Sequence, residues 1–502
     1  MDFILNHLLT LILFIPTVGA ILMLFLPKEN LKLLRWFTLA CSLVPFGLSL
    51  VLWAQFKPEV AGFQFQEQLN WYPAINSSYH LGIDGISLTL VLLTTLLTPL
   101  AILASFNIVD RVKPYMILFL VLETGLLGVF VSLDLLLFFV FWEAGLVPMY
   151  FIINQWGGAN RNYASLKFIL YTMGGSLGLL LAIQMIGVVS GTFDLPLLFQ
   201  RWTSLQTPLF GIPIETVKTI AFWAFVIAFA IKVPIWPFHT WLPDAHTEAP
   251  TAGSMLLAGV LLKLGAYGFL RLVLPLYPAQ AHQYAGALAF LATAAIVMGA
   301  LGAYGQNDFK RLVAYSSINH MGFVVLGIAA AAWAAGTENA VLALNGAVLQ
   351  MFNHGLSAAG MFFLVGVIYD RTHTRDLNQF GGLFTLVPID GRILLFTAMA
   401  SLGLPGLGGF ISEFLVVRGS WPVFTAATAV SMIGLFFTGA YMLKALKKVL
   451  HGPLNMRWSD CLPEMTTREI VVIAPLMALI VSIGVWPAWI LGVINHAISL
   501  GF

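Results

Sequence analysis

Apolar stretches long enough to cross a lipid bilayer recur from one end of this 502-residue sequence to the other. A helix needs about 20 predominantly apolar residues to span the hydrocarbon core. Only 9% of the residues are charged and 59% are hydrophobic, whereas roughly 25% of the residues of a soluble domain are charged. A transmembrane β-barrel would show short segments of alternating hydrophobicity instead. The sequence therefore predicts an all-α polytopic membrane protein, with one integral membrane domain over residues 1–502.

Hydropathy predicts about 14 transmembrane helices. Their predicted cores are 3–26, 33–54, 84–106, 115–131, 136–154, 164–190, 218–240, 253–273, 283–305, 311–333, 341–368, 388–418, 421–449 and 470–490. The first stretch lacks a basic leading region and a small-residue cleavage site, so we expect a helix there rather than a signal peptide. The polar stretch 55–80 and the loop 191–217 are expected to cap the outer face or to contact neighbouring subunits.

Lysine and arginine are concentrated in alternate loops of this predicted topology. The richer loops contain Lys28, Lys32, Arg35, Arg111, Lys113, Arg161, Lys167, Lys310, Arg311, Arg371, Arg375, Lys444, Lys447, Lys448, Arg457 and Arg468. Basic loops face the cytoplasm in multi-pass membrane proteins. An even number of spans then predicts that both termini lie on the opposite, periplasmic side.

Two of the predicted spans are interrupted. The seventh contains Pro234 and Pro237 beside Lys232, and the twelfth contains LGLPGLGGF at 402–410 shortly before Glu413. Non-helical backbone at membrane depth is tolerated only where it is buried in protein or lines a water-filled cavity. Interrupted spans at matching places in two halves indicate an inverted repeat. We therefore predict two five-helix repeats, spans 4–8 (115–273) and spans 9–13 (283–449).

Several ionisable residues lie inside the predicted spans. They are Glu123, Glu143, Lys232, Lys263, His320, His354 and Glu413. One interpretation is structural: a Glu and a Lys pair to hold two helices together, and each histidine is a hydrogen-bonded packing residue. However, a charged residue at the bilayer centre costs about 2.5–3.5 kcal/mol on insertion scales, and such residues are functional hypotheses by default. Because acids and bases alternate along one chain, the set favours a proton relay.

The physics of such a relay is simple. Burial favours the neutral form of a lysine, whereas a nearby carboxylate favours its charged form. If Glu143 is neutralised or moves away, we expect Lys232 to release its proton towards Lys263, a histidine or Glu413. Histidine suits intermediate steps because it titrates near neutral pH.

Other polar residues give weaker signals. Asp134 is predicted to be the N-cap of the fifth span, because short acceptor side chains favour that position. A cluster of four polar residues follows the seventh span and suggests a metal site, but it matches no known ligand spacing. These residues are His239, Asp244, His246 and Glu248. We place them in a loop at a membrane surface and favour capping and loop hydrogen bonds. Cys41 and Cys461 are poor candidates for a pair and offer no metal cluster.

Six stretches carry a resemblance to the antiporter-like membrane subunits of respiratory complex I, NADH-quinone oxidoreductase. They read FFVFWEAGLVPMY, KVPIWPFHTWLPDAHTEAPTAGSMLLAGVLLKLGAYG, YSSINHMGF, NHGLSAAGMFF, YDRTHTRDL and PGLGGFISEF. The resemblance covers nearly the whole chain. The same superfamily includes the large subunits of Mrp-type cation/proton antiporters and of membrane-bound hydrogenases. Glu413, the stretch HGLSAAG and the stretch RTHTRDL resemble the M-type branch rather than its L- and N-type sisters.

The resemblance implies a role for each buried ionisable group. Glu143 and Lys232 match a coupled pair, Lys263 matches a central relay, and Glu413 matches a terminal proton-exchange site. His320 and His354 match histidines of a central hydrophilic axis, and Glu123 matches a less regular acidic position.

The resemblance also implies a proton-translocating subunit of a bacterial inner-membrane enzyme, driven by redox chemistry elsewhere. NADH, FMN, iron–sulfur clusters and quinone are then expected in other subunits, and L- and N-type subunits are expected as neighbours. No motif predicts nucleic-acid binding. An Mrp-type cation/proton antiporter subunit remains an alternative, and so does a structural subunit without transport.

Overall fold

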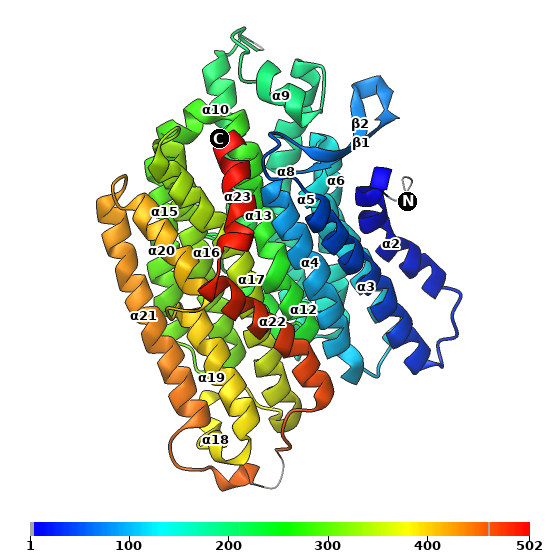
Figure 1. Cartoon of the computed structure of the whole chain (residues 1–502), viewed down its shortest axis with the longest axis vertical. Helices are drawn as coiled ribbons and strands as arrows, with labels where there is room; N and C mark the ends of the chain where they lie inside the picture. The colour runs from blue at the N-terminus through cyan, green and yellow to red at the C-terminus, as the bar shows by residue number, and fades with distance from the viewer. Residues whose placement is uncertain (1–4, 210, 460–461, 502) are drawn as a thin grey trace.

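The computed structural model of the chain describes residues 5–209, 211–459 and 462–501. Figure 1 shows a bundle of helices that run roughly along one direction. The first helix begins and the last helix ends towards the same end of this bundle, which also carries the only sheet among the described residues. The loops around residues 373–387 and 451–459 lie at the opposite end. Cys461 lies outside the described residues, so only Cys41 is seen, as a free thiol.

Twelve helical segments among the described residues are long and apolar enough to cross a membrane. They are α3 (Leu31–Gln55), α4 with η2 (Gly85–Ala104, Ser105–Asn107), α5 (Val112–Val131), α6 with α7 (Leu135–Ala144, Leu146–Trp156), α8 (Arg161–Ser190), α10 (Ile214–Lys232), the segment from α12 to α14 (Thr251–Leu276), α15 (Pro278–Tyr304), α16 (Phe309–Trp333), α17 (Glu338–Thr372), α21 (Thr425–Leu450) and α22 (Thr467–Val485).

The two remaining predicted spans are helical but shorter or broken. The first is α2 (Leu8–Met23), and the twelfth consists of α19 (Pro388–Leu402) and α20 (Gly408–Ser420). All fourteen predicted spans are thus helical, which confirms the all-α membrane fold. The sequence did not predict α23 (Ala488–Gly501), which packs against α17 and α4. Two short 3₁₀ helices, η5 (Leu377–Gln379) and η6 (Met456–Trp458), and helix α18 (Leu383–Leu386) lie at the end opposite the sheet.

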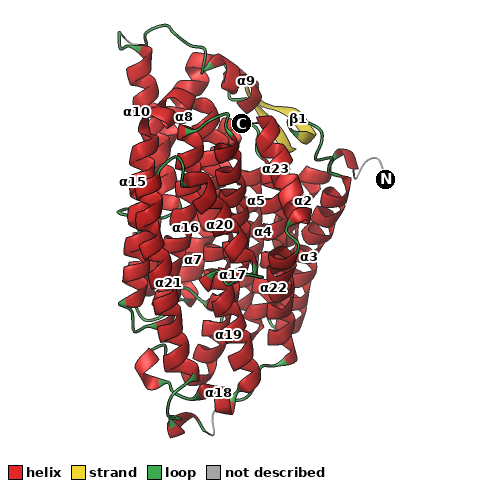
Figure 2. Ribbon diagram, turned by 60° about the vertical axis from the view of Figure 1, so that its left-hand side comes forward, coloured by secondary structure: helices red, strands yellow, loops and turns green. Residues whose placement is uncertain are grey.

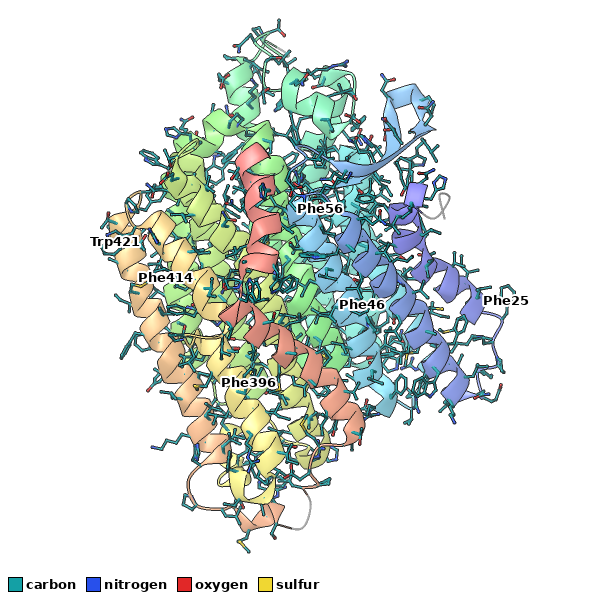
Figure 3. The ribbon with its side chains drawn as sticks, viewed as in Figure 1. Phe25, Phe46, Phe56, Phe396, Phe414 and Trp421 are labelled. Carbon is teal, nitrogen blue, oxygen red and sulfur yellow. The ribbon has the colours of Figure 1, made fainter. Side chains whose placement is uncertain are left out.

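The interior of the bundle is formed by α4, the segment from α12 to α14, α16 and α17, whose apolar stretches are almost entirely buried. Helices α3, α21 and α22 are peripheral and expose most of theirs. Large apolar side chains such as Phe25 and Phe436 are more than 70% exposed. Figure 3 shows Phe25 and Trp421 at opposite edges of the bundle. A surface this rich in exposed apolar groups fits a bilayer rather than water.

A small cap of strands and helix covers one end of the bundle. Strands β1 (Gln64–Tyr72) and β2 (Ser77–Ile83) pair antiparallel around the 3₁₀ turn η1 (Pro73–Ile75), and helix α9 (Leu195–Arg201) lies beside them (Figure 2). His80 Nδ1 on β2 lies 2.6 Å from Asp194 Oδ2 at the start of α9. Asp134 confirms its predicted capping role by accepting from the backbone N–H groups of Leu136 and Leu137, both at 3.0 Å.

Four interruptions shape the spans that carry the predicted ionisable residues. Helix α10 ends at Lys232, and the chain turns before α11 (Trp241–Glu248). Helices α19 and α20 are separated by residues 403–407, where Gly403 and Gly406 have φ of 82° and 92°. Gly145 interrupts the fifth span between α6 and α7.

The eighth span is interrupted by changes of helical pitch. It runs through α12 (Thr251–Leu256), the π-helical turn η3 (Leu257–Leu261), α13 (Leu262–Gly268), a second π-helical turn η4 (Phe269–Val273) and α14 (Leu274–Leu276). Such π-turns are frequent at functional sites. The two breaks predicted from the sequence are thus observed, the π-turns were not predicted, and the two five-helix repeats stay a prediction.

Candidate functional site

Lys263 and His354 are joined by a buried hydrogen bond between the eighth and eleventh spans. Lys263 Nζ on α13 lies 2.7 Å from His354 Nδ1 on α17, and it donates to the Ala258 carbonyl in η3 at 2.5 Å. Lys263 is 0% exposed and His354 is 3% exposed. The π-turn of η3 therefore supplies an acceptor for the ammonium, and the histidine supplies a partner that can take up its proton.

His320 and Glu413 continue the row from His354. The imidazole rings of His354 and His320 have centroids 5.7 Å apart, and His320 Nδ1 lies 2.7 Å from Glu413 Oε1 on α20. The two Nε2 atoms have no hydrogen-bond partner among the described residues. Lys263, His354, His320 and Glu413 thus form one row of acid–base groups, contributed by four different spans. A histidine in such a row can accept a proton on one nitrogen and give one from the other.

Three amide and hydroxyl side chains that the sequence analysis missed hold Glu413 in place. Gln350 Nε2 donates to Glu413 Oε1 at 2.9 Å, and Gln350 Oε1 accepts from Ser412 at 2.5 Å. Asn353 donates to the Gly408 carbonyl at 2.7 Å, at the start of α20. Gln350 precedes Asn353 by three residues and His354 by four, so it neighbours both of them on the surface of α17. These polar residues within an apolar span are the feature from which the sequence could have predicted the surroundings of Glu413.

Lys232 has a different environment from Lys263. It is 1% exposed, and its Nζ has no hydrogen-bond partner within the described part of the chain. The ammonium lies 4.6 Å from the ring centroid of Trp142, whose indole nitrogen donates to Ser176 Oγ at 3.0 Å. A cation over an aromatic face is stabilised by about 2 kcal/mol or more when desolvated. Trp142 is therefore a further residue of the site that the sequence analysis did not identify.

Glu143 influences Lys232 without touching it. Glu143 follows Trp142 on α6, and its charge acts on Lys232. No ion pair within 4.0 Å joins the two side chains in the residues that the structure describes. The influence of Glu143 on Lys232 is thus that of a nearby charge and not that of an ion pair.

The side-chain ammonium groups of Lys232 and Lys263 are not hydrogen-bonded to each other. Their helices pack tightly, since a Cβ on Gly265 would lie 3.0 Å from Lys232 Cβ and 2.8 Å from the Phe229 carbonyl oxygen. Nevertheless, no hydrogen bond between described residues links the two ammonium groups. The predicted site residues therefore form two groups, Glu143 with Lys232 and the row from Lys263 to Glu413.

Glu123 lies apart from both groups. It is 0% exposed on α5, and neither carboxylate oxygen has a hydrogen-bond partner among the described residues. The structure brings six of the seven predicted residues into the two groups and leaves Glu123 outside them.

The four polar residues after the seventh span are not in a surface loop, so that prediction was wrong. They lie in the break and in α11, and His246 and Glu248 are buried. The His246 ring stacks on Phe362 at 4.3 Å, and the charges of Lys310 and Lys263 act on it. Asp244 pairs with Lys167 at 2.7 Å and with Arg311 at 3.3 Å. No three potential ligands among the described residues are arranged to hold a metal ion. The sequence could not reveal this burial, because a short polar helix reads as a loop.

Three neighbouring elements hold the C-terminal end of α11. Arg375 donates to the Thr247 carbonyl, Gly158 N–H donates to the Glu248 carbonyl at 2.9 Å, and Lys310 donates to the Ala249 carbonyl. Cations stabilise the C-terminal end of a helix, where carbonyl groups lack intrahelical partners. Because Lys310 and Arg375 come from α16 and from the loop after α17, they tie the first interrupted span to the second half of the chain.

Comparison with known protein families finds relatives along nearly the whole chain. The family described as NADH:quinone oxidoreductase/Mrp antiporter matches residues 132–440, and the family described as NADH-ubiquinone oxidoreductase chain 4, amino terminus, matches residues 10–132. NADH-quinone oxidoreductase subunit M of Rhodobacter capsulatus is 42% identical over 98% of this chain and 96% of that relative.

Solved structures agree with these sequence matches. A chain of respiratory complex I from Thermus thermophilus, solved with bound NADH, superposes with a TM-score of 0.85 and 29% identity over 98% of this chain and 100% of that one. A chain of the Mrp complex from a Dietzia species superposes with a TM-score of 0.83 at 19% identity, over 98% of this chain and 97% of that one. At that identity the second match shows a shared fold alone.

Proposed function

Because the chain belongs to the family of NADH-quinone oxidoreductase M subunits, we propose that it is a proton-translocating subunit of such an enzyme's membrane arm. The observation that carries the proposal is the buried row from Lys263 through His354 and His320 to Glu413. Buried charges are costly, and they are retained in a membrane span where they form an ion or proton path. The chain would act as part of a translocase, while NADH, FMN, iron–sulfur clusters and quinone would bind to other subunits.

In the first step, Glu143 controls the charge of Lys232. The carboxylate of Glu143 and the face of Trp142 favour the ammonium form, whereas burial favours the amine. When Glu143 is neutralised or displaced, burial dominates and Lys232 loses its proton. Pro234 and Pro237 interrupt the helix directly after Lys232. Lys232 is therefore the last residue of α10 and lies beside the turn at the break.

In the second step, the charge change at Lys232 is felt by Lys263. Helices α10 and α13 pack closely, but the two ammonium groups are not bonded, so the influence is electrostatic. Two positive charges repel more strongly in a low-dielectric interior than in water. Loss of the proton from Lys232 therefore favours the protonated form of Lys263, and its return drives a proton from Lys263 to His354.

In the third step, the proton moves from His354 through His320 to Glu413. The 5.7 Å between the imidazole centroids requires a ring rotation or a bridging molecule, whereas the contact between His320 and Glu413 is already at 2.7 Å. Glu413 adjoins the break between α19 and α20, since its Oε2 atom would lie 3.4 Å from a Cβ on Gly403. We propose the break as the place where Glu413 exchanges its proton with the exterior of the chain.

The same proposal includes topology and partners. We propose a bacterial inner membrane, with both termini on the periplasmic side, where the loops are poor in Lys and Arg. Spans 4–8 and 9–13 would be the two inverted repeats, and each contains one of the two groups or most of it. L- and N-type subunits are the proposed neighbours. Glu123 has no assigned step.

A second candidate function is that of a cation/proton antiporter subunit without redox input. It is favoured by one observation, since the family that matches residues 132–440 is described for both kinds of complex. A buried row of acid–base groups serves either function.

The test uses inverted membrane vesicles from cells that lack this chain and from cells complemented with it, energised with NADH. Acidification of the lumen is followed with a fluorescent dye. We expect acidification only with the chain present, and a loss of at least about tenfold in Lys263→Met and Glu413→Gln, because positioned proton-transfer groups contribute 10²–10⁴-fold. Arg392→Gln, at an exposed position on α19, is the matched control. NADH oxidation by an artificial electron acceptor checks assembly in each strain.

The opposite results are equally informative. If the two variants assemble and acidify the vesicles as the wild type does, the row is not a proton path. If cells without the chain retain NADH-driven acidification, and added Na⁺ or K⁺ collapses a pH gradient only when the chain is present, the antiporter function replaces the proposal.

A further inference from the structure

A pocket of about 910 Å³ lies at the end of the bundle where α16 ends and α17 begins. Its walls come from α14, α15, α16, α17, α20 and α23, which meet there from distant parts of the sequence. The lining is rich in small and apolar side chains, among them Leu274, Pro275, Ala331, Ala340, Val341 and Leu344. The volume is within the roughly 300–1,000 Å³ range of sites for small organic molecules.

Two hydrogen bonds fix the walls of the pocket, one of them between two helices. Asn345 on α17 donates to Asn495 on α23 at 2.8 Å, which fixes the last helix over the eleventh span. Thr337 caps α17 by accepting from the Ala340 N–H at 3.3 Å. A pocket with walls fixed in this way is largely formed before a ligand arrives.

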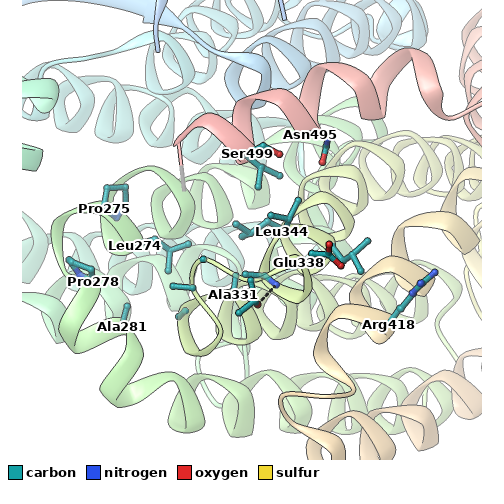
Figure 4. Close-up of a pocket in the computed structure, with 18 residues that line it drawn as sticks. Leu274, Pro275, Pro278, Ala281, Ala331, Glu338, Leu344, Arg418, Asn495 and Ser499 are labelled. Atoms are coloured by element: carbon teal, nitrogen blue, oxygen red, sulfur yellow. Dashed lines mark hydrogen bonds between the residues drawn. The ribbon is translucent and has the colours of Figure 1, made fainter. Parts of the chain in front are cut away.

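The charges of the pocket are concentrated towards one end. Glu338, in the first turn of α17, and Arg418, in the last turn of α20, both line it. In Figure 4 these two lie on one side, whereas Leu274, Pro275, Pro278 and Ala281 lie on the other side. Both side chains are exposed, and neither forms an ion pair within 4.0 Å among the described residues. The pocket thus has an apolar part and a part with one cation and one anion.

We propose that this pocket binds one phospholipid with a zwitterionic headgroup that carries a primary ammonium, as in phosphatidylethanolamine. Arg418 would bind the phosphate, because guanidinium and phosphate make strong charge-assisted hydrogen bonds. Glu338 would accept from the ammonium, and an acyl chain would follow the apolar wall towards Leu274 and Pro275. A purely anionic headgroup fits less well because Glu338 repels it, and a quaternary ammonium cannot donate a hydrogen bond to the carboxylate.

The lipid would serve as a fixed element of the structure rather than as bulk solvent. The pocket joins the start of α15, the end of α16 and the start of α17, and α16 and α17 carry His320 and His354. This site is distinct from the row of acid–base groups, and its existence does not depend on the proposed function.

The test uses the assembled membrane complex in nanodiscs of phosphatidylcholine doped with a phosphatidylethanolamine that carries a diazirine on one acyl chain. After illumination, crosslinked peptides are mapped by mass spectrometry. We expect crosslinks in residues 331–344 and 495–499, which unlabelled phosphatidylethanolamine competes away and phosphatidylglycerol competes less well. In the double variant Glu338→Gln with Arg418→Gln, crosslinking at these positions should fall at least about fivefold, since each lost charge contact weakens binding several-fold.

Two controls keep the result interpretable. Arg392→Gln removes an exposed arginine at the opposite end of the second half and should leave crosslinking unchanged. Ala335→Trp fills the pocket from an exposed loop position and should abolish crosslinking without burying a charge. Crosslinking in the wild type no stronger than at the exposed face of α21 would overturn the proposal. Equal crosslinking in the wild type and the double variant, or equal competition by phosphatidylglycerol, would overturn the assigned headgroup chemistry.

Discussion

At the scale of single residues, the two buried lysines of the site have different partners. Lys263 is bonded to a carbonyl and to a histidine, so its proton has a receiver in contact. Lys232 has an aromatic face and the charge of a carboxylate that it does not touch. In the proposed relay, Glu143 would therefore set the charge of Lys232, and Lys263 would pass its proton to His354. These two properties suit a sensor and a donor.

Trp142 tests the role of the aromatic face. In Trp142→Leu, the Lys232 ammonium loses about 2 kcal/mol of stabilisation, which favours the amine by roughly 30-fold. We expect NADH-driven acidification in inverted vesicles to fall several-fold, while Trp142→Phe retains a ring and most of the activity. Equal activity of the leucine and phenylalanine variants would show that the ring only fills space.

Asp84 and Arg271 form a buried ion pair that stabilises the fold and has no step in the proposed relay. Arg271 Nη2 lies 2.5 Å from Asp84 Oδ2, and Asp84 also caps α4. Burial alone raises the pKa of Asp84, but the charge and hydrogen bonds of Arg271 outweigh it, so the pKa lies below its usual range. The pair therefore stabilises the fold fully above the usual pKa of about 3.9, and this contribution is lost only as the pH falls through the lowered pKa.

Removal of one partner leaves a buried charge and costs roughly 3–5 kcal/mol. Arg271→Met should therefore lower the midpoint temperature for heat-induced aggregation of the chain in detergent at neutral pH, by several degrees, relative to Arg392→Gln. An unchanged midpoint would mean that the pair is exposed to water in solution.

At the scale of elements, the interruptions of the helices occur where the acid–base groups lie. Lys232 ends α10, Lys263 lies between two π-turns, and Glu413 faces the break after α19. Backbone that leaves the regular helix frees carbonyl groups, and these must be satisfied inside a membrane. Ala258 shows how this is done, since its carbonyl accepts from Lys263.

Alanine substitutions at Gly403 and Gly406 distinguish the effect of backbone strain from an effect on Glu413. Both have positive φ, so alanine at either costs roughly 1–2 kcal/mol. Only at Gly403 would the new Cβ meet Glu413 Oε2, at 3.4 Å, whereas nothing lies within 4 Å of a Cβ on Gly406. We expect both variants to be slightly less stable to heat, and only Gly403→Ala to slow NADH-driven acidification. Equal acidification by the two variants would contradict a role for the break in proton exchange.

Arg375 tests the hold on the end of α11. Its hydrogen bond to the Thr247 carbonyl involves a charged donor and contributes about 1.5–3 kcal/mol. In Arg375→Gln, we expect the amides of residues 245–249 to exchange with deuterium roughly 10- to 100-fold faster. Arg392→Gln is again the matched control. Unchanged exchange in this segment would show that Lys310 and Gly158 suffice to hold the helix end.

At the scale of the whole molecule, the sequence predicted the spans better than the contacts between them. Hydropathy located every predicted span because twenty apolar residues leave few alternatives. The breaks at Pro234 and Gly403 were predictable from residue type. The π-turns around Lys263 and the burial of His246 were not, because both depend on which helices pack together. Trp142 was missed for the same reason, since an aromatic residue in an apolar run carries no sign of the cation above it.

The separation between Lys232 and Lys263 has a consequence for energy storage. A continuous wire of acid–base groups across a membrane would conduct protons whenever a gradient existed, and the gradient would be short-circuited. No hydrogen bond between described residues joins the two ammonium groups, so in the proposed relay Lys232 acts on Lys263 through its charge and passes it no proton directly. In this arrangement the charge on Lys232 would influence Lys263 without a proton passing between the two residues. A tightly packed helix contact, and not only the ionisable residues, would therefore decide whether the stored gradient leaks.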